Sequence, residues 1–344
     1  MRSFKKALLK VLVFILVFSL LCTPSLYAYF KYGSANNNYM PDQLKEEGKV
    51  DFAICGASQS VWGFIPQIID EKCSVNSFNA SSGLISMEGR YFIIKNFIEK
   101  NPIKYLVMDF SYNGLIRDNS TDSVEGKLLV LEHLRGKDRL SYAVKSVKMD
   151  EIFQAFYYMF RTGTYTLVNG SENELKVPYR GKGYWGNKDA VDQSGKVYWL
   201  SQEKGTYYPR KPFDISDDSA FYLDKIMQLC KEENIKVYFV TTPYPLKVES
   251  IEDRQSTLEA HLALAQKYEC TFYDFNIYKN KEILFDDKTS FFDVEHLSTE
   301  GAVTLTTELA ELINNDDKGI GKSDKFYNTY YEYIDYYRNT YSVQ

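Results

Sequence analysis

Two short polar motifs near opposite ends of the chain carry side chains that could work together chemically. A Gly-x-Ser motif at 56–58 follows a short apolar run, and an Asp-x-x-His motif lies at 293–296. A serine hydroxyl is a poor nucleophile near neutral pH unless an imidazole accepts its proton, and a carboxylate can orient that imidazole through its other ring nitrogen. The residue types therefore predict a catalytic triad of Ser58, His296 and Asp293 for acyl transfer.

The spacing within each motif suits this chemistry. Gly56 permits a sharp turn that would expose the Ser58 hydroxyl at the carboxyl end of a strand. Residues three apart in a turn face the same side, so the Asp293 carboxylate can accept one ring N–H of His296 and leave the other nitrogen free as a base.

Each motif also has a simpler explanation. Ser58 could only cap the following turn, and the second motif could cap the last helix through Ser298 or Thr299. Ser60 is an alternative nucleophile, although it is less well placed. Two further histidines lie in helical patterns and are interpreted as surface or packing residues: His133 and His261.

Short apolar runs alternate with helical patterns along most of the chain. The runs that predict strands are 50–55, 74–78, 105–109, 236–241 and 271–274, and the predicted helices include 87–98, 221–230, 258–265 and 302–313. This alternation is typical of an α/β fold with a parallel sheet covered by helices on both faces. Ligands of such sheets bind at the carboxyl ends of the strands, where Ser58 is expected.

The amino terminus predicts a membrane segment. Basic residues precede an apolar stretch that continues to Phe30, and 7–30 exceeds the roughly 20 residues that cross a bilayer. A cleaved signal peptide ending at Ala28 is the alternative. Because Leu26 is large for the site three residues before such a cut, we favour an uncleaved anchor over 1–30. The basic flank places the remaining chain outside the cytoplasmic membrane.

After the anchor, composition and pattern predict four further parts of the chain. Residues 31–48 form a polar stem, 49–116 with 217–313 form the α/β core, 117–216 form an insertion or cap, and 314–344 form a tyrosine-rich tail. We favour a substrate-shaping lid over structural padding for the insertion. In the insertion, Tyr184 and Trp185 could stack on sugar rings, but packing is the simpler use. In the tail, one helical face predicts a docking helix: Tyr330, Ile334, Tyr337 and Tyr341.

The amino-acid composition excludes several classes of binding partner. A net charge of −5 provides no field for phosphate backbones, which excludes nucleic acid as an expected partner. Five cysteines without a CxxC pair and three histidines make a metal cage improbable, so we expect no metal and no cofactor, and we interpret Asp109 as a turn cap. Four cysteines of the body show no spacing that selects disulfide partners, and none is expected: Cys55, Cys73, Cys230 and Cys270.

Taken together, the motifs resemble the SGNH or GDSL-type hydrolases, in a divergent, membrane-anchored extracytoplasmic branch. Gly56-Ala57-Ser58 is similar to the family's first block, with Ala57 in place of aspartate, and 79–83 (Asn-Ala-Ser-Ser-Gly) is similar to the second. Asn113 follows the third predicted strand, although the glycine and aspartate of that block are missing. The resemblance implies a flavodoxin-like three-layer α/β/α core and an oxyanion hole formed by Ser58, Gly83 and Asn113.

The layout also resembles extracytoplasmic proteins that esterify or de-esterify envelope polymers. It implies a membrane-anchored serine esterase or O-acyltransferase that acts on acyl groups, above all acetyl, of envelope or exopolysaccharide glycans. Its expected partners are the cytoplasmic membrane, a glycan or acylated polymer, and a membrane-bound acyl-transfer partner. A non-catalytic glycan-binding or assembly protein is the alternative, and a phospholipid or thioester hydrolase is a third hypothesis.

Overall fold

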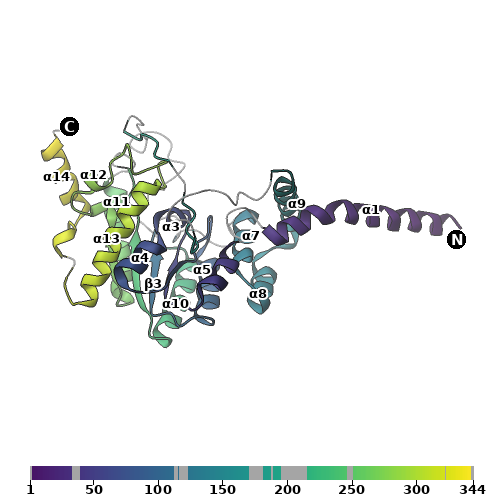
Figure 1. Ribbon diagram of the computed structural model, residues 1–344, viewed down its shortest axis with the longest axis horizontal. Helices are drawn as coiled ribbons and strands as arrows, with labels where there is room; N and C mark the ends of the chain where they lie inside the picture. The colour runs from purple at the N-terminus through teal and green to yellow at the C-terminus, as the bar shows by residue number, and fades with distance from the viewer. Residues whose placement is uncertain are drawn as a thin grey trace.

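A five-stranded parallel sheet forms the centre of the molecule (Figure 1). The computed structural model of the chain describes residues 2–32, 39–111, 115, 123–169, 181–186, 189–194, 215–245, 251–321 and 323–341. The strand order is β2-β1-β3-β4-β5, the arrangement of flavodoxin-like sheets. The strands are β1 (Phe52–Cys55), β2 (Ser77–Asn79), β3 (Tyr105–Asp109), β4 (Lys236–Thr241) and β5 (Thr271–Asp274). The predicted parallel α/β sheet is confirmed.

Helices cover both faces of the sheet because successive strand residues point to opposite sides. Ala53 and Cys55 belong to one apolar cluster, whereas Phe52 and Ile54 belong to a second. The first cluster includes side chains of α5 (Met87–Ile98), α10 (Asp217–Glu232) and α11 (Ile251–Lys267). The second includes side chains of α4 (Pro66–Cys73) and α13 (Thr299–Asp317). The core is therefore a three-layer α/β/α sandwich.

The predicted strands at 105–109, 236–241 and 271–274 match the observed bounds. The first strand, predicted at 50–55, begins two residues later at Phe52, and the second differs more. The apolar pattern predicts it at 74–78, whereas it lies at Ser77–Asn79. Ser74 instead adopts a left-handed conformation with φ of 56° and ends α4, where its N–H donates to the Asp70 carbonyl. A local helix-ending turn thus replaces the first part of the expected strand.

The tail ends in a helix that packs on the body. Helix α14 (Tyr330–Tyr341) contacts α11, and the Tyr330 N–H donates to Gln255 Oε1 at 2.8 Å. Ile334 and Tyr337 of the predicted face are partly buried, but Tyr333, which lies outside that face, is buried most deeply.

Among the described residues between β3 and α10 there are three helices. They are α7 (Val124–His133), α8 (Gly136–Ser146) and α9 (Ile152–Asn169), with a short 3₁₀ turn, η1 (Met149–Glu151), before the last. Two further pieces of the predicted insertion, 181–186 and 189–194, lie against the core. The Asn79 N–H donates to the Lys182 carbonyl at 2.9 Å, and Tyr184 is buried beside Ile65 and Ile68, so this tyrosine serves in packing.

The amino-terminal helix α1 (Arg2–Tyr32) projects from the body, and α9 packs beside it (Figure 1). Its segment Phe4–Lys31 is long and apolar enough to cross a membrane, a property that an anchor and a signal sequence share. The second half of the predicted stem forms helix α2 (Tyr39–Glu47), which contacts the body. Gln43 accepts a hydrogen bond from the Gly183 N–H, and Glu47 pairs with Lys182 at 3.1 Å.

Candidate active site

The first motif lies at the carboxyl edge of the sheet, where the strand order changes direction. Ser58 follows β1 and is the first residue of α3 (Ser58–Gly63). β1 lies between β2 and β3, which is the topological switch point of this strand order. A Cβ atom on Gly56 would lie 2.1 Å from Ser60 Oγ and 2.4 Å from the Asp109 Cβ atom. Only glycine therefore lets the turn before Ser58 pass this close to the end of β3.

A chain of hydrogen bonds joins the three residues of the two motifs. His296 Nε2 lies 2.7 Å from Ser58 Oγ, and His296 Nδ1 lies 2.9 and 3.0 Å from the two oxygens of Asp293. The carboxylate accepts the Nδ1–H, which leaves Nε2 as the acceptor for the serine proton. The structure thus brings the hydroxyl of Ser58 into contact with the imidazole of His296, more than 230 residues away in the chain, and this imidazole also contacts the carboxylate of Asp293.

The loop that carries the acid and the base is braced by its own backbone. Asp293 Oδ1 accepts the N–H groups of Glu295 and His296 at 2.8 and 2.9 Å, and a bridge pairs Phe291 with Leu297 across the loop. Burial favours the neutral carboxyl, but the His296 ring and these two N–H groups outweigh it and hold the pKa of Asp293 below its ordinary value. Asp293 is therefore ready to stabilise a charged imidazole.

A buried ion pair between Asp109 and Arg90 holds the backbone next to Ser58 in place. Asp109 Oδ2 accepts the Ala57 N–H at 3.2 Å, and Asp109 also accepts the N–H and hydroxyl of Ser111, each at 3.1 Å. Arg90 of α5 donates to the Asp109 carbonyl, and its Nη2 lies 3.7 Å from Asp109 Oδ2 with both side chains fully buried. Burial raises the pKa of Asp109, and the nearby guanidinium opposes that rise. Asp109 therefore does more than cap a turn, since it ties the ends of β1 and β3 together.

Arg90 belongs to neither motif, but its position in the sequence indicates a buried partner. Arg90 lies three residues after Met87 and four before Ile94, on the inward face of the predicted helix. A charged residue at a core-facing position needs a buried partner, and the carboxylate at the end of the neighbouring strand is that partner.

The proposed oxyanion residues are described only in part. Asn79 donates to the carbonyls of Ser60 and Phe64 at 2.8 and 3.0 Å, and the Ser82 N–H donates to the Gly56 carbonyl at 3.0 Å. Gly83, the next residue, thus follows a segment that is bound to the serine loop. The other candidate, Asn113, lies outside the described residues.

Two aromatic side chains lie against the histidine ring, and neither belongs to the two motifs. The Trp62 ring meets the His296 ring edge-on at 4.5 Å between centroids, and the Phe292 ring stacks on it at 5.4 Å with an interplanar angle of 16°. Both aromatic residues are only partly buried. They restrict the orientation of the imidazole and add an apolar, solvent-reaching wall beside Ser58.

The simpler explanation for Ser58 does not describe the observed contacts, whereas the one for the second motif holds in part, because Ser298 does cap α13 while His296 also contacts Ser58. Ala57, not Ser58, is the N-cap of α3, with no side-chain capping bond, and Ser298 caps α13 by accepting the Gly301 N–H. Ser60 is fully buried, with its hydroxyl on the Gly56 side of the turn.

The other two histidines are buried packing residues. His133 contacts the carbonyls of Leu129 and Ser81, and burial lowers its pKa. His261 packs against the rings of Phe110 and Phe272, and burial lowers its pKa to about 3.

Part of the predicted insertion lies beside the histidine loop. The Val191 N–H donates to the Phe291 carbonyl at 2.9 Å, and the Gln193 N–H donates to the Asp287 carbonyl at 2.8 Å. Backbone hydrogen bonds thus attach segment 189–194 to the loop that holds His296.

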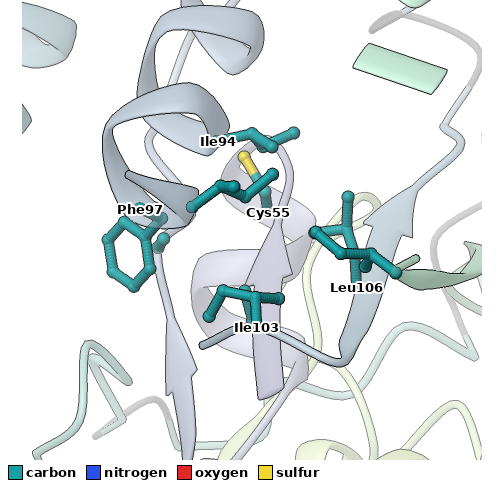
Figure 2. Close-up of a pocket in the computed structure, with 9 residues that line it drawn as sticks. Cys55, Ile94, Phe97, Ile103 and Leu106 are labelled. Atoms are coloured by element: carbon teal, nitrogen blue, oxygen red, sulfur yellow. The ribbon is translucent and has the colours of Figure 1, made fainter. Parts of the chain in front are cut away.

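The apolar void in Figure 2 is separate from this site. Cys55 points into it from β1, with Ile94 and Phe97 of α5 and Leu106 of β3 around the sulfur. Burial raises the pKa of the Cys55 thiol to about 12, which keeps it protonated and unreactive. All five cysteines of the chain are free thiols.

Comparisons with known proteins add little to this geometry. No model of a protein family matches the chain, and no curated protein matches it. Among the solved structures that match is that of a "putative acylhydrolase" from Bacteroides fragilis. It is 12% identical, has a TM-score of 0.38, and the match covers 82% of this chain and 97% of that one. A likeness this distant carries no argument about activity, so the candidate site has to be judged on its own contacts.

Proposed function

We propose that the protein is a membrane-anchored, extracytoplasmic serine esterase or O-acyltransferase that acts on ester-linked acyl groups, above all acetyl groups, of envelope glycans. The single observation that carries the proposal is the continuous hydrogen-bond chain from Ser58 through His296 to Asp293. Its order and distances are those that a hydroxyl nucleophile needs.

In the proposed reaction Ser58 Oγ attacks the ester carbonyl while its proton passes to His296 Nε2. The resulting imidazolium is stabilised by the Asp293 carboxylate at Nδ1. The tetrahedral intermediate collapses as His296 returns the proton to the departing sugar oxygen, which leaves an acyl group on Ser58. A water molecule or a second hydroxyl then repeats the sequence in reverse and frees the serine.

The developing negative oxygen needs N–H donors close to Ser58. The Ser58 N–H at the start of α3 is one candidate, and the Gly83 N–H and the Asn113 amide are the two others suggested by the family resemblance. Each such donor typically lowers the barrier by about 3 kcal/mol.

A glycan substrate suits the surroundings of the triad. The Asp293 side chain is 40% exposed, so the triad lies at the surface, where a long polymer has access. Trp62 and Phe292 offer partly exposed rings beside the nucleophile, and sugar rings pack well on such aromatic faces. In transfer, a second hydroxyl replaces water as the acceptor, and where the acyl group does not come from a glycan ester a membrane-bound partner would supply it.

The test uses the full chain in detergent micelles. We expect a fluorophosphonate to label Ser58 and a small acetyl ester to be hydrolysed, with both reactions lost in Ser58→Ala. Ser60→Ala is the matched control, since it removes a hydroxyl two residues away and should keep the label on Ser58. If the parent protein takes up no label but retains glycan on a column, the non-catalytic binding function is correct instead.

A further inference from the structure

The contact between α1 and α9 is unusually close for two helices. A Cβ atom on Gly163 would lie 1.8 Å from the Ser25 carbonyl oxygen and 3.1 Å from the Tyr29 nitrogen. Next to this point the hydroxyls of Ser25 and Thr164 lie 2.8 Å apart. Close approach at a glycine, reinforced by small hydroxyl residues, is the packing mode of helices within membranes.

This contact makes the last third of α1 part of the folded body. Ser25, Ala28 and Tyr29 are buried, whereas most of the preceding helix is exposed. Cleavage after Ala28 would remove Ser25, whose carbonyl oxygen lies closest to Gly163. The contact therefore argues that α1 is retained.

The outer side of α9 is apolar and exposed. Phe153 is 85% exposed and Val168 is 76% exposed, and the other large apolar side chains of the helix that are exposed are Ile152, Tyr157, Tyr165 and Leu167. The exposed polar residues of the helix are Gln154, Arg161 and Asn169. Arg161 is the only charged residue of α9, and its guanidinium lies over the rings of Tyr157 and Tyr158. An exposed surface rich in aromatic residues and lacking acidic ones is typical of a helix at a lipid–water interface.

The apolar surface of α9 continues into that of α1. Phe156 of α9 stacks on Phe18 of α1 with ring centroids 6.1 Å apart, and Phe18 lies well inside the segment that is long enough to cross a membrane. Leu140 and Val144 of neighbouring α8 are also exposed. A membrane that surrounds α1 would therefore meet α9 without any change in the structure.

We propose that α9 is an interfacial membrane helix, which packs on a retained α1 and lies in the lipid leaflet nearest the body. This inference rests on the membrane anchor of the proposed function. It adds a second membrane contact to the body, which would restrict rotation of the body about α1.

The test is spin labelling of the full chain in lipid nanodiscs. Labels are placed at Phe153→Cys and Val168→Cys in a background with the two partly exposed native thiols removed (Cys73→Ser, Cys270→Ser). Leu16→Cys in α1 is the lipid reference, and Ile320→Cys, an exposed apolar position after α13, is the water reference. We expect labels at 153 and 168 to collide with oxygen more than with a nickel chelate, as at 16, and the reverse at 320.

Three measurements test the membrane contact of α9, its packing on α1 and the proposed catalysis separately. If labels at 153 and 168 behave like the one at 320, or if the label at 16 is itself in water, the inference is wrong. Gly163→Leu should alter the collision profile at 153; an unchanged profile would overturn packing on α1. Phosphonate labelling of Ser58 in the same nanodiscs reports the proposed catalysis independently, so failure of one proposal is distinguishable from failure of the other.

Discussion

The serine edge of the sheet and the contact between α1 and α9 are each built around a glycine, but their surroundings differ. At Gly56 the close approach brings two strand ends together so that Asp109 can bind the Ala57 N–H, with Arg90 buried beneath. At Gly163 the close approach joins two helices whose remaining side chains are largely apolar and exposed. A glycine thus allows a buried polar contact next to Ser58 in one region and close packing of two helices in the other.

The largest loss of ester hydrolysis should come from substitution of Asp293. Asp293→Asn keeps the shape of the side chain but removes the carboxylate that selects the ring tautomer, so we expect acetyl-ester hydrolysis to fall by about 10⁴-fold. Steady-state kinetics measure this effect. The control is Glu295→Gln, which removes a carboxylate from the same loop and should retain activity. An equal loss in both variants would mean that the charge of the loop, and not the orientation of His296 by Asp293, is what matters.

A smaller loss is expected at the first glycine. Gly56→Ala places a methyl group 2.4 Å from the position of the Asp109 Cβ atom, so the turn before Ser58 must shift. A displacement of this kind should lower the hydrolysis rate by about 10²-fold. Gly321→Ala is the control because nothing lies within 4 Å of its added methyl group. Full activity in Gly56→Ala would show that the close approach does not position the nucleophile.

The second glycine should affect stability rather than chemistry. Gly163→Ala places a methyl group against the Ser25 carbonyl, and overpacking of this kind costs about 1–3 kcal/mol. Thermal unfolding in nanodiscs measures the loss, again with Gly321→Ala as the control. Ester hydrolysis should be unchanged in Gly163→Ala at temperatures where it stays folded; a parallel loss of hydrolysis would mean that the two regions are coupled.

The smallest expected effect is the loss, at acid pH, of the contribution that the Asp293 carboxylate makes to folding stability. Its pKa is lower in the folded protein than the ordinary value of 3.8, so the folded state binds this proton more weakly than the unfolded chain. The stabilisation is therefore present above pH 3.8 and is lost as the pH falls below that value. Urea unfolding of the parent protein and Asp293→Asn should differ by a constant amount near neutral pH, and the difference should shrink below about pH 4. A difference that stays constant down to about pH 3 would contradict this linkage.

Local patterns predicted the sheet well because strands and their crossover helices have their own periodicity. The runs at 105–109 and 236–241 are apolar on both faces and form central strands with the expected bounds. The edge strand β2 was placed less well, because Ser74 ends a helix there. The sequence pattern does not predict helices α7, α8 and α9. Their apolar residues lie in the core, against α1 and on the exposed surface, so they do not form one apolar face.

Within the candidate site, residue types and chain position indicated Ser58, Asp293 and His296, and the structure brings these side chains into contact. The supporting residues were not found in this way. Trp62 and Phe292 have no motif of their own, and their importance appears only when their rings lie against His296.

The sequence by itself determined the parallel α/β architecture, an apolar amino-terminal helix and the pair of motifs, because each depends on residues close together in the chain. Only the tertiary structure decided what lies beneath and beside them: Arg90 against Asp109, and Gly163 against Ser25. These contacts join distant segments through shape and burial, which no local periodicity encodes.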